Sequence, residues 1–286
     1  MRVLVFGETG QVARALARQG AARGAQVAAL GRDRADLADA QACAAAIAAT
    51  DAEVVVNAAA YTAVDRAEAE PGLAHAVNEG APGAMARACA ARALPFLHVS
   101  TDYVFDGAPG RGWREDDPTD PLGVYGASKR AGEAAVTEAG GAHAILRTAW
   151  VFSAHGANFV RTMLRLGAER DVLRVVDDQI GGPTPARAIA DALLDIATEF
   201  RAGRGVTGVF HFAGAPAVSW AGFARAIFAG RGGPGPRIEE VPSSDYPTVA
   251  RRPLNSVLDC AKIKAAYGID PPDWRDGLAA VLRELA

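Results

Sequence analysis

The sequence predicts an α/β protein with a doubly wound parallel sheet and a smaller C-terminal lobe. Short apolar runs alternate with amphipathic helical stretches through the first half of the 286 residues. Continuous apolar strands of this kind are typical of a parallel sheet that is covered by helices on both faces. Right-handed crossovers between such strands then produce the doubly wound arrangement.

The strands and helices of the first half follow from apolar runs, helical periodicity and turn residues. Strands are expected over Arg2–Phe6, Gln26–Leu30, Glu53–Asn57, Pro95–Val99 and Ala142–Arg147. Helices are expected over Gln11–Arg23, Leu37–Thr50, Pro71–Arg92 and Tyr125–Ala139.

The second half is less regular, and no long linker separates it from the first. Helices are expected over Asn158–Glu169 and Arg187–Arg201, because apolar residues return there every three or four positions. A further strand is expected over Val206–Phe212, and the glycines and prolines of Ala229–Arg237 predict a loop.

Composition argues against several classes of function. The formal net charge of -3 provides no basic surface for nucleic acid. Cys43, Cys89 and Cys260 are widely spaced, which favours a reducing cytoplasm over a disulfide framework. No apolar stretch reaches the ~20 residues that span a membrane. The first residues form a strand-like run, so we expect a cytoplasmic protein without a secretory leader.

A glycine-containing turn follows the first predicted strand and opens the first helix. Gly7 suits a tight turn, and Gly10 lets the backbone approach a pyrophosphate at the helix N-terminus, which begins with Gln11 and Val12. Ala13 is small enough for close packing of the helix on the strand. The turn predicts dinucleotide binding, and an ordinary strand–helix turn is the alternative.

The end of the second strand predicts NADPH in preference to NADH. Gly31 stands where an NAD-selective site has an acid, and the Arg32 guanidinium can bind a 2′-phosphate. Asp33 would favour NADH if the register slipped by one residue, and a solvated surface arginine is the alternative for Arg32. Asp36 and Leu37 are placed to flank the adenine, although Asp36 could instead cap a helix.

Small residues after the third strand, in Asn57–Thr62, let a cofactor lie against the backbone, and structural alanine packing is the alternative. Tyr125 and Lys129, four residues apart, share one face of a predicted helix. Lysine occurs at only two other positions, Lys262 and Lys264, so this spacing is informative. We expect the Lys129 ammonium to lower the pKa of Tyr125, whose hydroxyl then protonates a carbonyl oxygen as hydride arrives. A surface pair is the alternative.

Hydroxyl and carboxyl groups follow the fourth strand, at the edge where ligands bind in such sheets. The Thr101 hydroxyl is placed to hold the substrate carbonyl, and Ser100 competes for that role. Asp102 is placed to bind a sugar hydroxyl, although a capping role is equally ordinary.

These motifs resemble the extended short-chain dehydrogenase/reductases, and more closely the dTDP-4-dehydrorhamnose reductases. The more specific segments are Phe6–Val12, Asn57–Asp65, Ser100–Asp106, Arg147–Trp150, Asp178–Thr184 and Arg252–Ser256. The resemblance spans nearly the whole chain and implies a Rossmann-type fold. Residues 1–150 are expected to bind the dinucleotide, with some later segments returning to that domain, and residues 151–286 to form mainly the substrate lobe.

The resemblance implies NAD(P)H-dependent reduction of the C4 ketone of dTDP-4-dehydro-L-rhamnose to dTDP-L-rhamnose. It assigns catalysis to Thr101, Tyr125 and Lys129, and substrate contacts to Asp102 and Trp150. Cofactor contacts are assigned to Gly10, Gln11, Val12, Ala60, Tyr61 and Thr62. The Trp150 face suits a base or deoxysugar, with core packing as the alternative. Arg252 could pair with the diphosphate, or form a surface ion pair.

Some relatives bind Mg²⁺ through acidic side chains at a dimer contact. The matching positions here are Ala15 and Arg187, which cannot supply carboxylates, so the sequence does not support that metal or that mode of dimerisation. A homodimer with another contact stays open. Two other functions fit the motifs. A reductase or epimerase of another nucleotide sugar would use the same tyrosine and lysine. A non-catalytic NADP-binding regulatory subunit would not need Thr101, Tyr125 and Lys129 to be intact.

Overall fold

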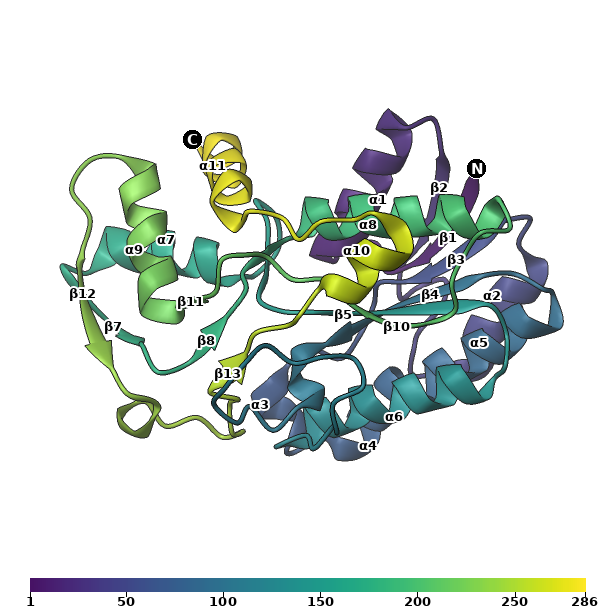
Figure 1. Ribbon diagram of the computed structural model, residues 1–286, viewed down its shortest axis with the longest axis horizontal. Coiled ribbons are helices and arrows are strands. Elements are labelled where there is room, and N and C mark those ends of the chain that lie inside the picture. Colours follow the sequence, from purple (N-terminus) through teal and green to yellow (C-terminus); the bar gives the residue numbers. More distant parts are fainter.

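A six-stranded parallel sheet forms the centre of the computed structural model, which describes residues 1–286 (Figure 1). The strand order is β10-β5-β4-β3-β1-β2, so the winding direction changes at β1. The strands are β1 (Arg2–Phe6), β2 (Gln26–Leu30), β3 (Val54–Asn57), β4 (Phe96–Thr101), β5 (His143–Thr148) and β10 (Gly208–His211). The predicted α/β fold with a doubly wound parallel sheet is confirmed.

Helices cover both faces of the sheet. On one face lie α1 (Gln11–Ala22) and α8 (Ala186–Arg201), which pack against each other (Figure 1). The opposite face is covered by α2 (Ala40–Ala49), α5 (Ala81–Ala91) and α6 (Val124–Glu138). Short elements precede α5: α3 (Val64–Ala67), α4 (Pro71–His75) and a π-helical turn, η1 (Ala76–Gly80).

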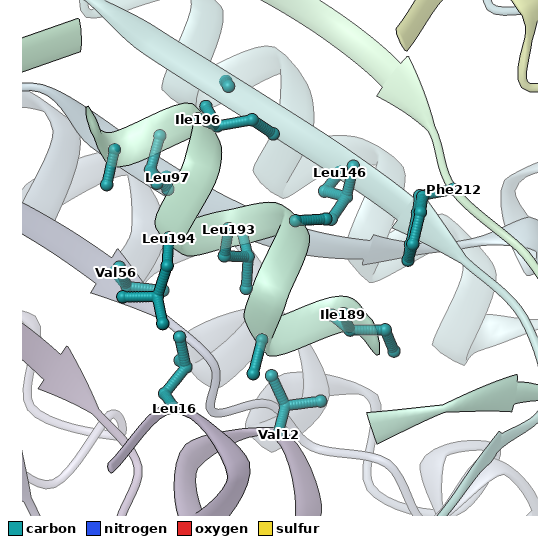
Figure 2. Close-up of a cluster of buried hydrophobic side chains, with 14 of the residues drawn as sticks. Val12, Leu16, Val56, Leu97, Leu146, Ile189, Leu193, Leu194, Ile196 and Phe212 are labelled. Atoms are coloured by element: carbon teal, nitrogen blue, oxygen red, sulfur yellow. The ribbon is translucent and has the colours of Figure 1, made fainter. Parts of the chain in front are cut away.

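The larger apolar core lies between the sheet and the α1–α8 layer (Figure 2). Val12 and Leu16 from α1 meet Ile189 and Leu193 from α8 over strand residues such as Val56. Two elements of the second half, α8 and β10, therefore complete the sheet layer. The short helix α10 (Ala261–Tyr267) packs against both of them.

The remaining elements form a separate lobe beyond the carboxyl ends of the strands (Figure 1). Its core contains buried aromatic residues such as Phe223 and Trp274. The helices are α7 (Phe159–Glu169), α9 (Trp220–Arg231) and α11 (Trp274–Leu285), and the longer strands are β7 (Val172–Val176) and β12 (Arg237–Val241). Five two-residue strands form two small sheets, with β6 paired to β9 and β8 lying between β11 and β13. They are β6 (Val151–Phe152), β8 (Ile180–Gly181), β9 (Thr184–Pro185), β11 (Val218–Ser219) and β13 (Asn255–Ser256). Two 3₁₀ turns are η2 (Asp102–Val104) and η3 (Ser243–Asp245).

Several predicted boundaries are wrong. The strand expected over Val206–Phe212 begins two residues later, at Gly208, and ends at His211. The loop expected over Ala229–Arg237 is shorter, because α9 continues to Arg231 and β12 begins at Arg237. The second helix starts at Ala40 instead of Leu37, since the Asp39 carboxylate accepts hydrogen bonds from the first-turn N–H groups. The fourth strand continues to Thr101, which places Ser100 and Thr101 inside β4. None of the helices combines the length and apolar character that crossing a lipid bilayer requires.

Candidate active site

A cavity of about 950 Å³ lies at the carboxyl ends of β1, β3 and β4, between the sheet and the C-terminal lobe. Most residues singled out in the sequence line it. They are Gly7, Gly10, Gln11, Val12, Arg32, Asp36, Leu37, Ala60, Thr62, Thr101, Asp102, Tyr125, Lys129 and Trp150. Two predicted site residues, Tyr61 and Arg252, are absent from the lining.

The glycine turn after β1 has the shape that an anionic ligand needs. Gly7 has a φ of 108°, which favours glycine. Gly10 is the N-cap of α1, so no side chain bonds to the N–H groups there, and the first turn of α1 contains no acidic residue. A Cβ added at Gly10 would find only Ala58 O, 4.0 Å away. The N–H groups that begin α1 are therefore open to a pyrophosphate, so the residues fit a dinucleotide.

Charges of both signs surround the end of β2. Arg32 lines the cavity, and no carboxylate lies within ion-pair distance of it. A Cβ at Gly31 would lie 2.5 Å from Glu8 Oε2 and 2.6 Å from Asp33 Oδ1, so two acids take the space beside this glycine. Asp36 accepts a hydrogen bond from the Ala38 N–H at 2.9 Å. The alternative that Asp36 caps the next helix is wrong, because Asp39 is that cap.

Tyr125 and Lys129 lie one turn apart on α6 and both face the cavity. Lys129 is only 2% exposed, and its Nζ donates to Val99 O at 2.7 Å. Burial lowers the pKa of Lys129 to about 8, against a smaller raising effect of the Glu133 carboxylate.

The pKa of Tyr125 is raised, not lowered as the sequence predicts. Burial raises it to about 12, the Thr101 hydroxyl opposes this, and the Asp102 carboxylate adds to it. The expected lowering by Lys129 is wrong for this structure because desolvation of the phenolate outweighs any attraction to the neighbouring amine. The phenol is therefore protonated at neutral pH.

Thr101 and Asp102 form a buried pair at the end of β4. The Thr101 hydroxyl donates to Asp102 Oδ1 at 3.0 Å and accepts from the Tyr103 N–H at 3.2 Å. Asp102 Oδ2 is buried without a partner, and burial raises the pKa of this carboxyl to about 6. Ser100 instead donates to Glu133 Oε1 at 2.5 Å, which leaves Thr101 as the hydroxyl beside Tyr125.

A buried ion pair fixes α6 against the sheet. Arg147 on β5 donates to both carboxylate oxygens of Glu133 on α6, at 2.9 and 2.7 Å, and both side chains are 6% exposed. Close backbone contacts reinforce this packing. A Cβ at Gly126 would lie 2.1 Å from Tyr103 O, and one at Gly132 only 2.0 Å from Asn78 O. Only glycine allows α6 to approach η2 and η1 this closely.

Aromatic side chains form the wall toward the lobe. Trp150 follows β5 with a φ of 47°, which is rare for a bulky residue. Its ring stacks on Trp220 of α9 with centroids 3.5 Å apart and planes within 8°. A Cβ at Gly181 would lie 2.6 Å from the Trp150 indole, so this glycine leaves room for the ring. Sequence reasoning missed Trp220 and the cavity-lining Thr148, whose hydroxyl is buried without a partner.

The two predicted residues outside the cavity make other contacts. The Tyr61 hydroxyl donates to Glu70 at 2.6 Å, and its N–H donates to Asn78 Oδ1 at 2.8 Å. Arg252 donates to Asp65 Oδ2 at 2.8 Å, as its ion-pair alternative requires.

Ala15 and Arg187, the positions matched to the metal site of some relatives, line a second cavity of about 780 Å³ between α1, α8 and α11. No group of three or more His, Cys, Asp or Glu side chains is arranged to hold a metal ion.

Comparison with known proteins shows the family of this chain. The model of the RmlD substrate binding domain family matches residues 1–286. A Burkholderia thailandensis protein named dTDP-4-dehydrorhamnose reductase is 47% identical and covers 100% of this chain and 99% of its own length. An Escherichia coli protein of the same name is 37% identical, over 100% of this chain and 98% of its own.

Solved structures give the same result. The Bacillus anthracis dTDP-4-dehydrorhamnose reductase in complex with NADP has a TM-score of 0.93 and 29% identity, over 99% of both chains. The Clostridium acetobutylicum ortholog has a TM-score of 0.93 and 31% identity, over 100% of this chain and 99% of its own. The chain therefore belongs to the RmlD substrate binding domain family, the family of the dTDP-4-dehydrorhamnose reductases.

Proposed function

We propose that this protein reduces the C4 ketone of dTDP-4-dehydro-L-rhamnose with NADPH and produces dTDP-L-rhamnose. The observation that carries the proposal is that Thr101, Tyr125 and Lys129 line one cavity with the open glycine turn at Gly7 and Gly10. The shared name of the full-length relatives and the NADP complex of the Bacillus anthracis protein support it.

The glycine turn would hold the pyrophosphate at the N-terminus of α1, with Ala60 and Thr62 beside the dinucleotide. Arg32 would bind the 2′-phosphate, since it faces the cavity without a carboxylate partner. Asp36 and Leu37 would flank the adenine. When bound, NADPH supplies the hydride for C4.

Tyr125 gives its proton to the sugar O4, while the Thr101 hydroxyl orients the same oxygen. A pKa of about 12 keeps Tyr125 protonated at neutral pH, and its proton leaves only when negative charge develops on O4. Lys129 would then stabilise the phenolate, and it would hydrogen-bond the nicotinamide ribose of a bound cofactor. Asp102 and Trp150 hold the sugar nucleotide, and the Trp150 face excludes water from one side.

The product identifies the reaction. The protein is mixed with NADPH and dTDP-4-dehydro-L-rhamnose, and the product is identified by NMR. We expect dTDP-L-rhamnose, and Tyr125→Phe should lower turnover by about 10²-fold or more. Tyr246→Phe is the matched control, because that side chain is 51% exposed and lies outside the cavity.

Three outcomes would contradict the proposal. Turnover only with a different nucleotide sugar would favour a sister reductase. Stoichiometric oxidised cofactor in the purified protein, without net reduction, would favour an epimerase. An unchanged cellular role for Tyr125→Phe would favour the regulatory subunit.

The preference for NADPH is tested separately. Arg32→Ala should lower kcat/KM for NADPH by about tenfold, the loss of one charge-assisted contact, and change it little for NADH. Arg34→Ala is the control, because Arg34 lies outside the cavity lining and is 3.7 Å from Glu8. Equal efficiency of the wild type with both cofactors would refute the preference.

A further inference from the structure

A buried chain of polar side chains lies behind Lys129, on the side away from the cavity. His98 on β4 is 0% exposed, and its Nε2 lies 3.2 Å from Lys129 Nζ. Its other ring nitrogen, Nδ1, lies 3.2 Å from Asn57 Nδ2 on β3. Asn57 Oδ1 in turn accepts the Ala59 N–H at 3.1 Å. The proposed proton transfer to the sugar uses neither His98 nor Asn57.

The position of the single imidazole proton of His98 depends on the charge of Lys129. Burial and the nearby Lys129 hold the pKa of His98 well below its usual value, so the imidazole is neutral and has one N–H. A charged ammonium only donates, so His98 Nε2 would have to accept and Nδ1 would carry the proton. That proton would then point at the Asn57 NH₂ group, which is also a donor.

A neutral amine resolves this conflict. His98 Nε2–H can then donate to Lys129 Nζ, and Nδ1 can accept from Asn57 Nδ2. Asn57 Oδ1 keeps its bond to the Ala59 N–H, and every group has a partner. With a charged amine, Asn57 must turn its oxygen toward His98 and give up that bond. The orientation of the amide and the charge on Lys129 are therefore linked.

Few charges compete for control of this amine. On α6, Glu133 acts on it, but the Glu133 carboxylate is already paired with Arg147 of β5, and Tyr125 lines the same cavity as Lys129. Asp102 lies beside Tyr125, and no carboxylate is within 4.0 Å of Lys129 Nζ. The nearest polar contacts of the amine are the neutral His98 ring and Val99 O.

We propose that His98 is a positioning residue for Lys129 and changes tautomer with the charge on the amine. When Lys129 is neutral, the imidazole proton is on Nε2. When Lys129 takes up one proton from the cavity side it becomes an ammonium. His98 keeps its single proton, which at equilibrium lies on Nδ1 instead of Nε2, and Asn57 turns its oxygen to it. The inference rests on the proposed function, because it assigns control of the Lys129 charge in that reaction.

A second buried histidine provides an internal control. His211 on β10 is 0% exposed, its Nε2 lies 3.3 Å from Arg147 Nη1, and its Nδ1 lies 3.0 Å from Trp113 O. Because arginine stays charged, His211 Nε2 must accept and Nδ1–H must donate to the carbonyl at every pH that leaves the protein folded.

The test is the tautomer of each histidine, measured by two-bond ¹H–¹⁵N correlation NMR on the full chain from about pH 6 to pH 10. The His98 signals are assigned by their loss in His98→Gln. We expect His98 to change from Nδ1–H to Nε2–H as the pH rises, and His211 to remain Nδ1–H. In Lys129→Met the change at His98 should disappear, while unchanged His211 signals show that the fold is intact.

A single His98 tautomer across this range in the wild type would overturn the proposal. So would a change that persists in Lys129→Met. The spectra require neither sugar nucleotide nor cofactor, so failure of the proposed reaction would leave this result interpretable.

As a second readout, the alkaline limb of the kcat–pH profile should move to higher pH in His98→Gln, because an amide oxygen stabilises the ammonium form. An unmoved limb would contradict the assigned control.

Discussion

Replacing Gly126 with alanine should displace the proposed acid without touching any side chain in the cavity. Gly126 follows Tyr125 on α6 and packs against the backbone of η2. The added Cβ would lie 2.1 Å from Tyr103 O, whereas ordinary contact begins at 3.4 Å. The two backbones must therefore separate by about 1.3 Å. A misplacement of about 1 Å in a catalytic group can cost ~10²-fold.

The assay compares steady-state kinetics of Gly126→Ala and wild type, with thermal unfolding measured on the same samples. We expect kcat to fall by about 10²-fold while the protein stays folded. Gly72→Ala is the control, because Gly72 is also helical, is exposed, and has no atom within 4 Å of an added Cβ. Similar kcat values for both variants would refute the idea that this contact positions Tyr125.

Two further predictions concern buried charge. Glu133→Gln should lower the free energy of unfolding by about 3–5 kcal/mol, because it leaves the Arg147 guanidinium buried without a charged partner. The control is Glu199→Gln, which removes an ion pair at the surface and should lower the free energy of unfolding by at most ~1 kcal/mol. Equal losses for the two variants in urea unfolding would contradict the reasoning. Burial lowers the pKa of Lys129 to about 8, below its usual 10.5, so the unfolded chain binds this proton more tightly. The unfolding free energy of the wild type, measured relative to Lys129→Met, should therefore rise with pH between about 8 and 10.5, and a flat difference would show that the amine is not desolvated.

The sequence predicted the sheet well because its strands are buried on both faces. Such strands appear as unbroken apolar runs, and four of the first five were placed to within one residue at each end, while β4 is two residues longer at its C-terminus. The lobe was harder to predict. Strands β7 and β12 are partly exposed and pair only with each other, and β12 follows a glycine- and proline-rich loop that hides the end of α9.

The sequence predicted the residues that line the candidate site where their positions follow from strand ends, and it missed those whose positions follow from tertiary packing. Parallel strands bring Gly7 and Thr101 to one edge whatever the side chains do. By contrast, Trp220 reaches the cavity because α9 of the C-terminal lobe packs against Trp150, and no local sequence pattern predicts this long-range contact. The pKa of Tyr125 was predicted in the wrong direction, since desolvation depends on surroundings that sequence spacing does not reveal.

Helix α8 packs on α1 and on the same face of the sheet, so synthesis on the ribosome imposes an order on folding. The first five strands emerge long before Ala186–Arg201, and until then the apolar surface around Val12 and Leu16 has no cover. A fragment ending near residue 150 would keep that surface exposed, and it would also lack the edge strand β10. The first half of the chain thus cannot complete its fold ahead of the half that follows it, and the nascent chain exposes an aggregation-prone face through most of its translation.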